Sequence, residues 1–253
     1  MLTQYGINHG GYNLFDLLIK KADLLLQSGT PGFEFKRSDI STNIRFIGPV
    51  LPYAAASKKT FSLGEKMKQY EKVILITQGT FEPDSSKLII PALEALKDSN
   101  DLVIVTTAGN GTADLQKQYP QVNILIEDFI PFNQVMPLAD VFISNGGYGG
   151  VLLSISNKLP MVVAGVHEGK NEINARVGYF KLGINLKTEK PSVMAIRNAV
   201  EEVLHNDIYR LNTTRLSKEF SHYHPAALCE KYVDELTQQI PTPSLLHNRV
   251  MNN

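Results

Sequence analysis

The stretch Ala139–Ile155, "ADVFISNGGYGGVLLSI", decides the fold of this chain. A short apolar run ends at Ser144 and passes into four glycines among the six residues 145–150, after which an apolar run of helical character follows. This order predicts a buried strand, a tight turn and then a helix. Junctions of this kind are typical of parallel sheets, whose strands are joined by helices.

The same alternation runs along the chain from residue 72 onward. The segments predicted to be strands are Val73–Thr77, Leu102–Thr107, Val122–Glu127, Asp140–Ser144, Met161–Ala164 and Ile184–Lys187. The segments predicted to be helices are Ser85–Asp98, Tyr148–Lys158, Asn171–Leu182, Ser192–His205, Ile208–Phe220 and Pro225–Gln239. Strands that are apolar on both faces and separated by helices predict an α/β fold with a doubly wound parallel sheet, Rossmann-like in pattern.

The first seventy residues have a different pattern. Residues 11–29 predict a helix that leads into a strand, and residues 29–53 are turn-rich and extended. One helix and one strand cannot bury a core of their own. We therefore expect residues 1–50 to be the end of another domain or a strap packed on the α/β domain. Residues 51–70 are expected to be a linker, residues 71–240 the α/β domain and residues 241–253 a loose tail.

Composition limits the class of protein. The chain has 253 residues, of which 43% are hydrophobic, so it can bury a sizeable core. Its 25 basic residues equal its 25 acidic residues, which gives no reason to expect a nucleic acid partner. The single cysteine, Cys229, excludes an internal disulfide and fits a reducing compartment. The chain has no apolar run of about 18 residues, so no membrane-spanning helix is expected. The expected location is the cytoplasm.

The glycines after Ser144 predict an anion site. Ligands of open parallel sheets bind at the carboxyl ends of the strands, near the point where the strand order reverses. The first N–H groups of a helix that starts there lack intrahelical partners, and the helix dipole favours negative charge. Glycine permits a tight turn and leaves no Cβ between the backbone and a phosphate. A phosphate or diphosphate is therefore the expected ligand, although tight helix packing on the sheet would also explain glycines here.

A second junction points to the same edge of the sheet. The strand Val73–Thr77 is followed by Gln78, Gly79 and Thr80, which can also face phosphates. An ordinary turn in which Asp84 caps the next helix would explain this segment equally well. Neither junction fits the Walker A spacing or G-x-G-x-x-G, which disfavours an ATPase and a standard dinucleotide site.

The segments "ITQGT", "IEDFIPFNQVMPLADVFISNGGYGG", "KLPMVVAGVHEGKNEINARV" and "LGINLKT" together resemble a known family. They are similar to the carboxyl-terminal half of GT-B glycosyltransferases of the UDP-glucuronosyl/UDP-glucosyltransferase family, most of all the bacterial macrolide- and flavonoid-type enzymes. The resemblance covers residues 27–239. It implies a carboxyl-terminal GT-B domain that binds a nucleotide sugar as co-substrate, with no further cofactor and no metal.

The resemblance also implies roles for individual residues. Those expected at the diphosphate are Gln78, Gly79, Thr80, Asn145, Gly146, Gly147, Tyr148, Gly149 and Gly150. Those expected to hold the base are Asp128, Phe129, Ile130 and Pro131, and those expected at the sugar are Glu168, Gly169 and Lys170. The backbone N–H groups of residues 147–150 are the expected donors to the leaving diphosphate.

Three positions depart from the pattern of the family. Asn145 stands where many members have a histidine, and an amide donates a hydrogen bond but carries no positive charge. Gly169 stands where an acidic residue is usual, with Glu168 as its neighbour. Leu153 stands where a polar residue often reaches the ribose, which weakens the expectation of ribose binding.

The resemblance implies inverting transfer of a hexosyl group from a nucleoside diphosphate sugar, most simply a UDP-sugar, to the hydroxyl of a small-molecule acceptor. In that family an amino-terminal domain binds the acceptor and supplies a histidine base, and none of the histidines here lies in a matching motif. No catalytic residue is therefore assigned, and the amino-terminal domain is an expected partner. The alternatives are a domain that binds the nucleotide sugar without catalysis, an interaction module, and another sugar-nucleotide enzyme of the same architecture.

Overall fold

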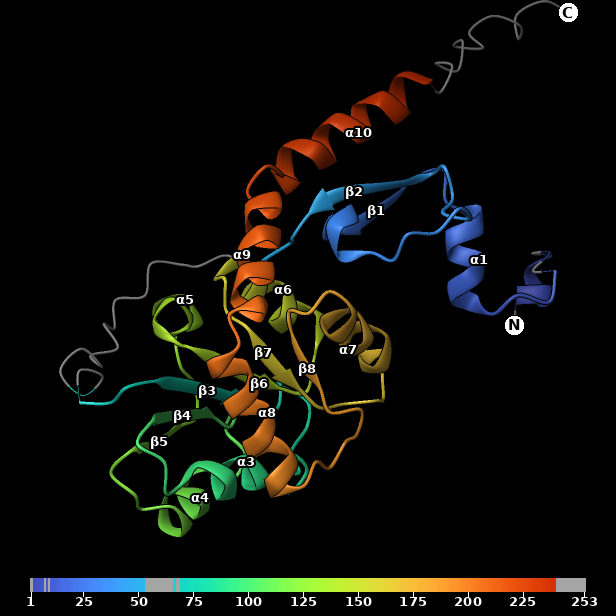
Figure 1. Cartoon of the computed structure of the whole chain (residues 1–253). Coiled ribbons are helices and arrows are strands. Elements are labelled where there is room, and N and C mark those ends of the chain that lie inside the picture. The colour runs from blue at the N-terminus through green and yellow to red at the C-terminus, as the bar shows by residue number, and fades with distance from the viewer. Residues whose placement is uncertain (1, 7, 9, 53–65, 67–68, 240–253) are drawn as a thin grey trace, which may run out of the picture.

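The computed structural model describes residues 2–6, 8, 10–52, 66 and 69–239 (Figure 1). The linker predicted for residues 51–70 lies mostly outside these residues, and the predicted tail over 241–253 lies wholly outside them. The described part of the chain forms a six-stranded α/β unit and a smaller amino-terminal unit with its own two-stranded sheet.

The six-stranded sheet has the order β5-β4-β3-β6-β7-β8, and all its neighbouring strands are parallel. The strands are β3 (Val73–Thr77), β4 (Leu102–Thr106), β5 (Ile124–Glu127), β6 (Val141–Ser144), β7 (Met161–Val163) and β8 (Gly183–Asn185). The chain builds outward from β3 to β5, returns to the other side of β3 and builds outward again from β6 to β8. The strand order therefore reverses between β3 and β6, as expected for a doubly wound sheet.

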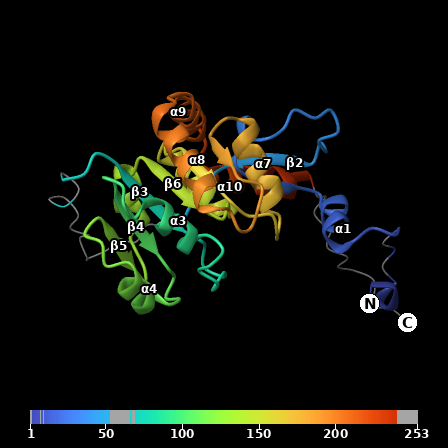
Figure 2. The ribbon, with the colours of Figure 1, turned by 60° about the horizontal axis from the view of Figure 1, so that its bottom comes forward.

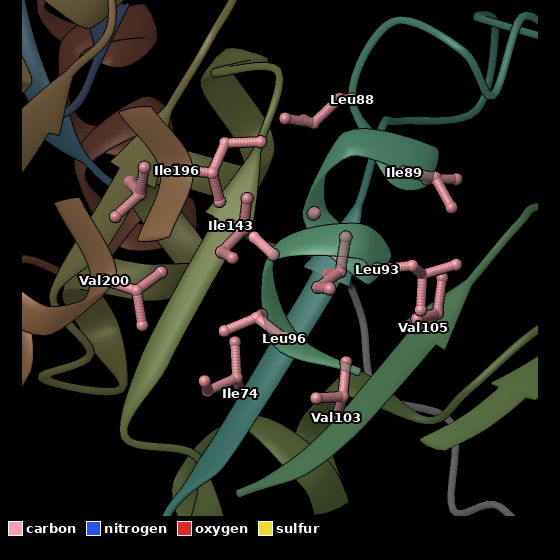
Figure 3. Packing of buried hydrophobic residues seen from close by; sticks show 14 of the residues in the cluster. Ile74, Leu88, Ile89, Leu93, Leu96, Val103, Val105, Ile143, Ile196 and Val200 are labelled. Carbon is pink, nitrogen blue, oxygen red and sulfur yellow. The ribbon is translucent and has the colours of Figure 1, made fainter. Parts of the chain in front are cut away.

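Helices cover both faces of this sheet. They are α3 (Ile89–Leu96), α4 (Thr112–Gln118), α5 (Phe132–Val135), α6 (Tyr148–Ser156), α7 (Lys170–Tyr179), α8 (Val193–His205) and α9 (Ile208–Phe220), with the 3-10 turn η3 (Met136–Leu138). The last helix, α10 (Pro225–Gln239), extends away from this sheet (Figure 1). On one face, α3 and α8 pack on the sheet, and Leu93 and Ile196 meet side chains such as Ile74 and Ile143 (Figure 3). On the other face, α5, α6, α7 and α9 enclose a second apolar core around Phe142.

The predicted strands and the long carboxyl-terminal helices are confirmed, because continuous apolar runs and amphipathic periods are strong local signals. The helix predicted from Ser85 is wrong at its start. Residues 84–88 form a turn in which the Lys87 N–H donates to the carbonyl of Asp84 at 3.1 Å, and α3 begins at Ile89. The short helices α4 and α5 were not predicted.

The amino-terminal unit contains η1 (Leu2–Tyr5), α1 (Leu14–Lys21), β1 (Leu25–Ser28), η2 (Pro31–Phe33) and β2 (Ile44–Gly48). β1 and β2 pair in parallel, and both views show α1 lying to one side of the large sheet (Figures 1 and 2). Leu14, Phe15 and Leu18 of α1 are 56%, 76% and 59% exposed. Parallel sheets normally have both faces covered, so this unit presents apolar surface suited to further structure.

The chain links the two units at several places. Arg176 of α7 and Glu34, which follows η2, form an ion pair at 2.8 Å, and both side chains are mostly buried. α10 contacts β2, and Gly48 at the end of β2 lies close to Tyr223, which precedes α10. The segment after β1 thus packs on the α/β unit. Whether residues 1–50 are the end of another domain or a strap stays a prediction, as do the exact domain boundaries.

Candidate functional site

A cavity of about 210 Å³ lies at the point where the strand order reverses. The last residues of three neighbouring strands, Thr77, Thr106 and Ser144, are in register and line its base. The remaining lining residues are Gly79, Thr80, Ala108, Phe129, Ile130, Phe132, Phe142, Asn145, Gly147 and Gly150. This is the position at which open parallel sheets bind their ligands.

The amino terminus of α6, where Gly147 and Gly150 line this cavity, has three backbone donors without a partner. Gly147 is the N-cap and makes no side-chain cap bond, and the first helical hydrogen bond runs from the Val151 N–H to the Gly147 carbonyl at 3.0 Å. Among the described residues, the N–H groups of Tyr148, Gly149 and Gly150 therefore have no acceptor. Unpaired N–H groups at the positive end of a helix dipole form a site for an anion.

One member of the expected donor set, Gly147, has an acceptor for its N–H group within the turn. The Gly147 N–H donates to Asn145 Oδ1 at 3.3 Å, and the Gly146 N–H donates to Ser144 Oγ at 3.0 Å. Both groups are used to shape the turn. The donors available to a ligand therefore begin at Tyr148 instead of Gly147.

The glycines of the run serve different purposes. Gly146 has φ +78°, and a Cβ built there would lie 1.7 Å from Oδ1 of the fully buried Asn174. A Cβ on Gly149 would meet nothing within 4 Å, and one on Gly150 would make ordinary contact with Phe142 at 3.7 Å. The fold therefore requires glycine at residue 146, whereas at residues 149 and 150 it leaves open space above the helix start.

Asn145 fixes the turn with both atoms of its side-chain amide. Its Nδ2 donates to the carbonyl of Gln78, and its Oδ1 accepts the Gly147 bond. The side chain lines the cavity, but its hydrogen bonds join the loops that follow β3 and β6. These bonds give it a positioning role in the turn, and its contact with a diphosphate stays a prediction.

Gln78 is likewise structural. It is 2% exposed, its Nε2 donates to the carbonyl of Asp84 at 2.7 Å, and its Oε1 accepts the N–H groups of Leu88 and Ile89 at 3.2 and 3.3 Å. This amide caps α3 and does not line the cavity. Its neighbours Gly79, with φ +81°, and the exposed Thr80 do line it.

The segment predicted to hold a base divides in two. Phe129 and Ile130 line the cavity, and Phe129 is 73% exposed, so a flat apolar surface lies at the opening. The Asp128 carboxylate accepts a hydrogen bond from Thr112 Oγ1 at 2.5 Å, and its carbonyl accepts one from Thr106 Oγ1 at 2.9 Å. Asp128 thus holds the loop while Phe129 and Ile130 face the cavity, and Pro131 is the N-cap residue of α5.

The residues predicted to contact the sugar lie after β7 and do not line the cavity. Glu168 and Gly169 have φ +56° and +81°, and the Lys170 ammonium pairs with the Glu168 carboxylate at 2.5 Å. Glu189 accepts hydrogen bonds from the N–H groups of Val166 and His167 at 2.6 and 3.0 Å, which fixes the start of this loop. Burial raises the pKa of Glu189, whereas these hydrogen bonds and the nearby charges of His167 and Lys170 lower it. The net result is a pKa below the ordinary value.

Tyr148 contributes its backbone to the site and directs its side chain elsewhere. The phenol donates to the carbonyl of Ser28 at 2.5 Å, and the ring stacks on Phe33 at 6.4 Å between centroids. Burial raises the pKa of this phenol. Leu153, farther along α6, packs against the second apolar core, so its side chain is occupied by packing.

Sequence reasoning missed the strand-end hydroxyls and Asn174. Each strand that reaches the cavity ends with a residue that carries a hydroxyl group, namely Thr77, Thr106 or Ser144. This pattern can be read in the sequence. The buried Asn174 donates to the carbonyl of Gly165 at 2.9 Å beside the turn at Gly146. No local signal identifies this contact, because its partners lie in other loops.

None of the residues that line the cavity has an ionisable side chain. Over the described residues, no group of three or more histidine, cysteine or acidic side chains is placed to hold a metal ion. In the same part of the chain, no helix has the length and apolar character needed to cross a membrane. The site therefore has the chemistry of binding: backbone donors, hydroxyls and an apolar surface.

Most of the chain is similar to known proteins. Residues 91–234 match the family described as erythromycin biosynthesis protein CIII-like, C-terminal domain. UDP-glucosyltransferase 1 of Beauveria bassiana is 36% identical over 228 residues, which cover 87% of this chain and 49% of that protein. The 4'-demethylrebeccamycin synthase of Lentzea aerocolonigenes is 33% identical over 207 residues, covering 82% of this chain and 48% of its own length. The chain thus spans about half the length of these curated relatives.

Solved structures share the fold. The glycosyltransferase of kitacinnamycin superposes with a TM-score of 0.75 at 20% identity, over 95% of this chain and 60% of that one. Spinosyn rhamnosyltransferase SpnG complexed with thymidine diphosphate gives 0.69 at 17% identity, over 83% and 56%. Os79 from O. sativa in complex with UDP gives 0.63 at 19% identity, over 76% and 49%. The chain belongs to the family of erythromycin biosynthesis protein CIII-like carboxyl-terminal domains, and its fold is that of the carboxyl-terminal half of a GT-B UDP-glycosyltransferase.

Proposed function

We propose that this chain binds the donor, a UDP-sugar, for an inverting glycosyltransferase. The observation that carries the proposal is the set of three unpaired N–H groups, on Tyr148, Gly149 and Gly150, beside the cavity at the strand-order reversal. A diphosphate supplies the negative charge and acceptor oxygens that such a helix start favours. The apolar surface of Phe129 and Ile130 suits a flat base at the same cavity.

The donor half acts mainly on the leaving group. As the acceptor oxygen forms its bond to the anomeric carbon, the bond from that carbon to the diphosphate breaks, and the acceptor proton passes to a base. Negative charge increases on the departing diphosphate, where fixed N–H donors lower the barrier by a few kcal/mol. The nucleotide sugar serves as co-substrate, and no other cofactor is part of the proposal.

Transfer requires groups beyond this cavity. No ionisable side chain lines it, so we propose that the acceptor site and the base belong to an amino-terminal half. The relatives are about twice as long as the region that they share with this chain, which leaves room for such a half. The proposed reaction is hexosyl transfer to the hydroxyl of a small molecule in the cytoplasm. A chain that binds the nucleotide sugar without transfer is the second candidate, and the same observation about the cavity favours it.

Calorimetric titration of the chain with UDP, thymidine diphosphate and uridine tests donor binding. Gly150→Ala adds a methyl group at the cavity wall without a clash, so we expect it to weaken UDP binding by about tenfold, equivalent to about 1.4 kcal/mol. Gly178→Ala is the matched control. Gly178 lies in α7, away from the cavity, and a Cβ there would be in ordinary contact with Asn185 at 3.6 Å. Equal UDP affinity in both variants would contradict the proposed site.

Incubation with UDP-glucose and a panel of phenols and alcohols separates the two candidate functions. Glycoside formation by the chain alone would show that it carries its own base. UDP binding without glycoside would favour the binding function for this chain and leave transfer to a protein that includes an acceptor half.

A further inference from the structure

The first turn of α6 has few interactions that stabilise it from within the helix. Its N-cap, Gly147, makes no side-chain cap bond, and Gly149 and Gly150 follow in the same turn. Glycine disfavours helix because it loses more backbone entropy than other residues, and a helix start without a side-chain cap frays more readily. The stability of this turn therefore depends on contacts from outside the helix.

Tyr148 is the residue of this turn that reaches out of the α/β unit. Its phenol donates to the Ser28 carbonyl at the end of β1, and its ring stacks on Phe33 at an interplanar angle of 21°. Gly29 leaves room for the contact, because a Cβ there would lie 2.6 Å from the phenol oxygen. The amino-terminal segment is thus shaped to receive this side chain.

The segment that receives Tyr148 is anchored independently to other helices. Glu34 pairs with Arg176 of α7, and the Gly32 N–H donates to Glu219 of α9 at 2.9 Å. These contacts keep the segment near α6 when the Tyr148 contact is lost. The Tyr148 contact can therefore form and break while the two units stay attached.

We infer that Tyr148 couples donor binding to the docking of residues 25–34. The inference rests on the proposed diphosphate site, since an anion bound to the N–H groups of residues 148–150 and the Tyr148 side-chain contact both require the same formed turn. Two events that stabilise the same turn favour each other, and the coupling is reciprocal. Donor binding therefore orders the end of β1, and the docked end of β1 strengthens donor binding.

Hydrogen exchange of the chain, with and without UDP, tests this coupling. Tyr148→Phe removes the phenol hydroxyl and keeps the ring that stacks on Phe33. Tyr209→Phe is the matched control, because its hydroxyl contacts Glu202 at 3.4 Å between α8 and α9. We expect UDP to slow exchange in residues 147–152 of all three proteins.

The distinguishing readout is the exchange of residues 25–34. UDP should slow it in the wild type and in Tyr209→Phe, and the slowing should be about fivefold smaller in Tyr148→Phe, as the loss of one hydrogen bond implies. By reciprocity, the UDP affinity of Tyr148→Phe should fall by a similar factor. Unchanged slowing in residues 25–34 of Tyr148→Phe would overturn the coupling while leaving the donor site intact. Absence of any UDP effect on residues 147–152 would overturn the donor site and the coupling together.

Discussion

Gly146 and Gly150 stand four residues apart in one glycine run, yet different physical needs select them. Gly146 adopts φ +78° and lies against the buried Asn174, so the fold itself excludes a side chain there. Gly150 has ordinary space around it and borders the cavity. A single motif thus contains one glycine that the fold requires and another that borders the cavity without such a requirement.

Gly146→Ala is expected to lower the free energy of unfolding by about 2–4 kcal/mol, because it adds both backbone strain and overpacking. Urea denaturation followed by circular dichroism measures the change. Gly178→Ala, which places its Cβ in ordinary contact, serves as control and should leave stability unchanged or raised. A loss of less than about 0.5 kcal/mol for Gly146→Ala would show that the turn relaxes readily.

Asn145 and Gln78 mark the limit of prediction at the residue scale. The sequence places both at strand ends, and the structure confirms those places. Their side chains, however, bond to loop backbone: Asn145 to Gln78, 67 residues away, and Gln78 to the start of α3. An amide at a strand end suggests a ligand contact as readily as a loop contact, and only the three-dimensional arrangement separates them.

At the scale of elements, the loop after β7 depends on one carboxylate. Glu189 accepts the N–H groups of Val166 and His167. Burial raises its pKa, but these hydrogen bonds and the nearby charges of His167 and Lys170 together bring the pKa below the ordinary 4.5. A lowered pKa in the folded state means that the ionised group adds stability above its unfolded pKa. That stability is lost as pH falls through the folded pKa.

Glu189→Gln is therefore expected to be less stable than the wild type at pH 7, and the difference should shrink as pH falls from about 5 toward 3. Urea unfolding at a series of pH values measures it. Glu201→Gln on the exposed side of α8 is a suitable control. A difference between wild type and Glu189→Gln that does not vary with pH would assign the effect to shape instead of charge.

Elements differ in how well the sequence predicts them. β3 and β4 are predicted nearly residue for residue, because five consecutive buried apolar positions have no other common explanation. α4 is missed because its sequence, "TADLQKQ", is short and polar, with only Leu115 buried. The pairing of β1 with β2 is missed because the intervening segment is turn-rich and carries no helical pattern of a usual crossover.

At the scale of the whole molecule, topology creates the candidate site. The reversal of strand order between β3 and β6 opens a cavity, and the glycine run delivers the start of α6 to its edge. The sequence predicts this meeting of elements because parallel strands end at one side of the sheet. It cannot predict the contact of Tyr148 with β1, which joins residues 120 positions apart.

The amino-terminal unit lies outside the candidate site. Its two-stranded parallel sheet and the exposed apolar side chains of α1 offer a surface for further structure. The curated relatives are about twice as long as the region they share with this chain. Within the proposed function, this unit belongs to the acceptor half, and Tyr148 connects it to the donor.

The proposed function depends on diphosphate binding by the free backbone amides at the start of α6. Residue-resolved NMR titration of the chain with UDP, and separately with uridine, measures it most directly. We predict that UDP shifts the amide resonances of Tyr148, Gly149 and Gly150 most strongly, and that uridine, which lacks phosphate, leaves these three nearly unchanged. UDP binding that shifts amides elsewhere and leaves these three in place would contradict the account.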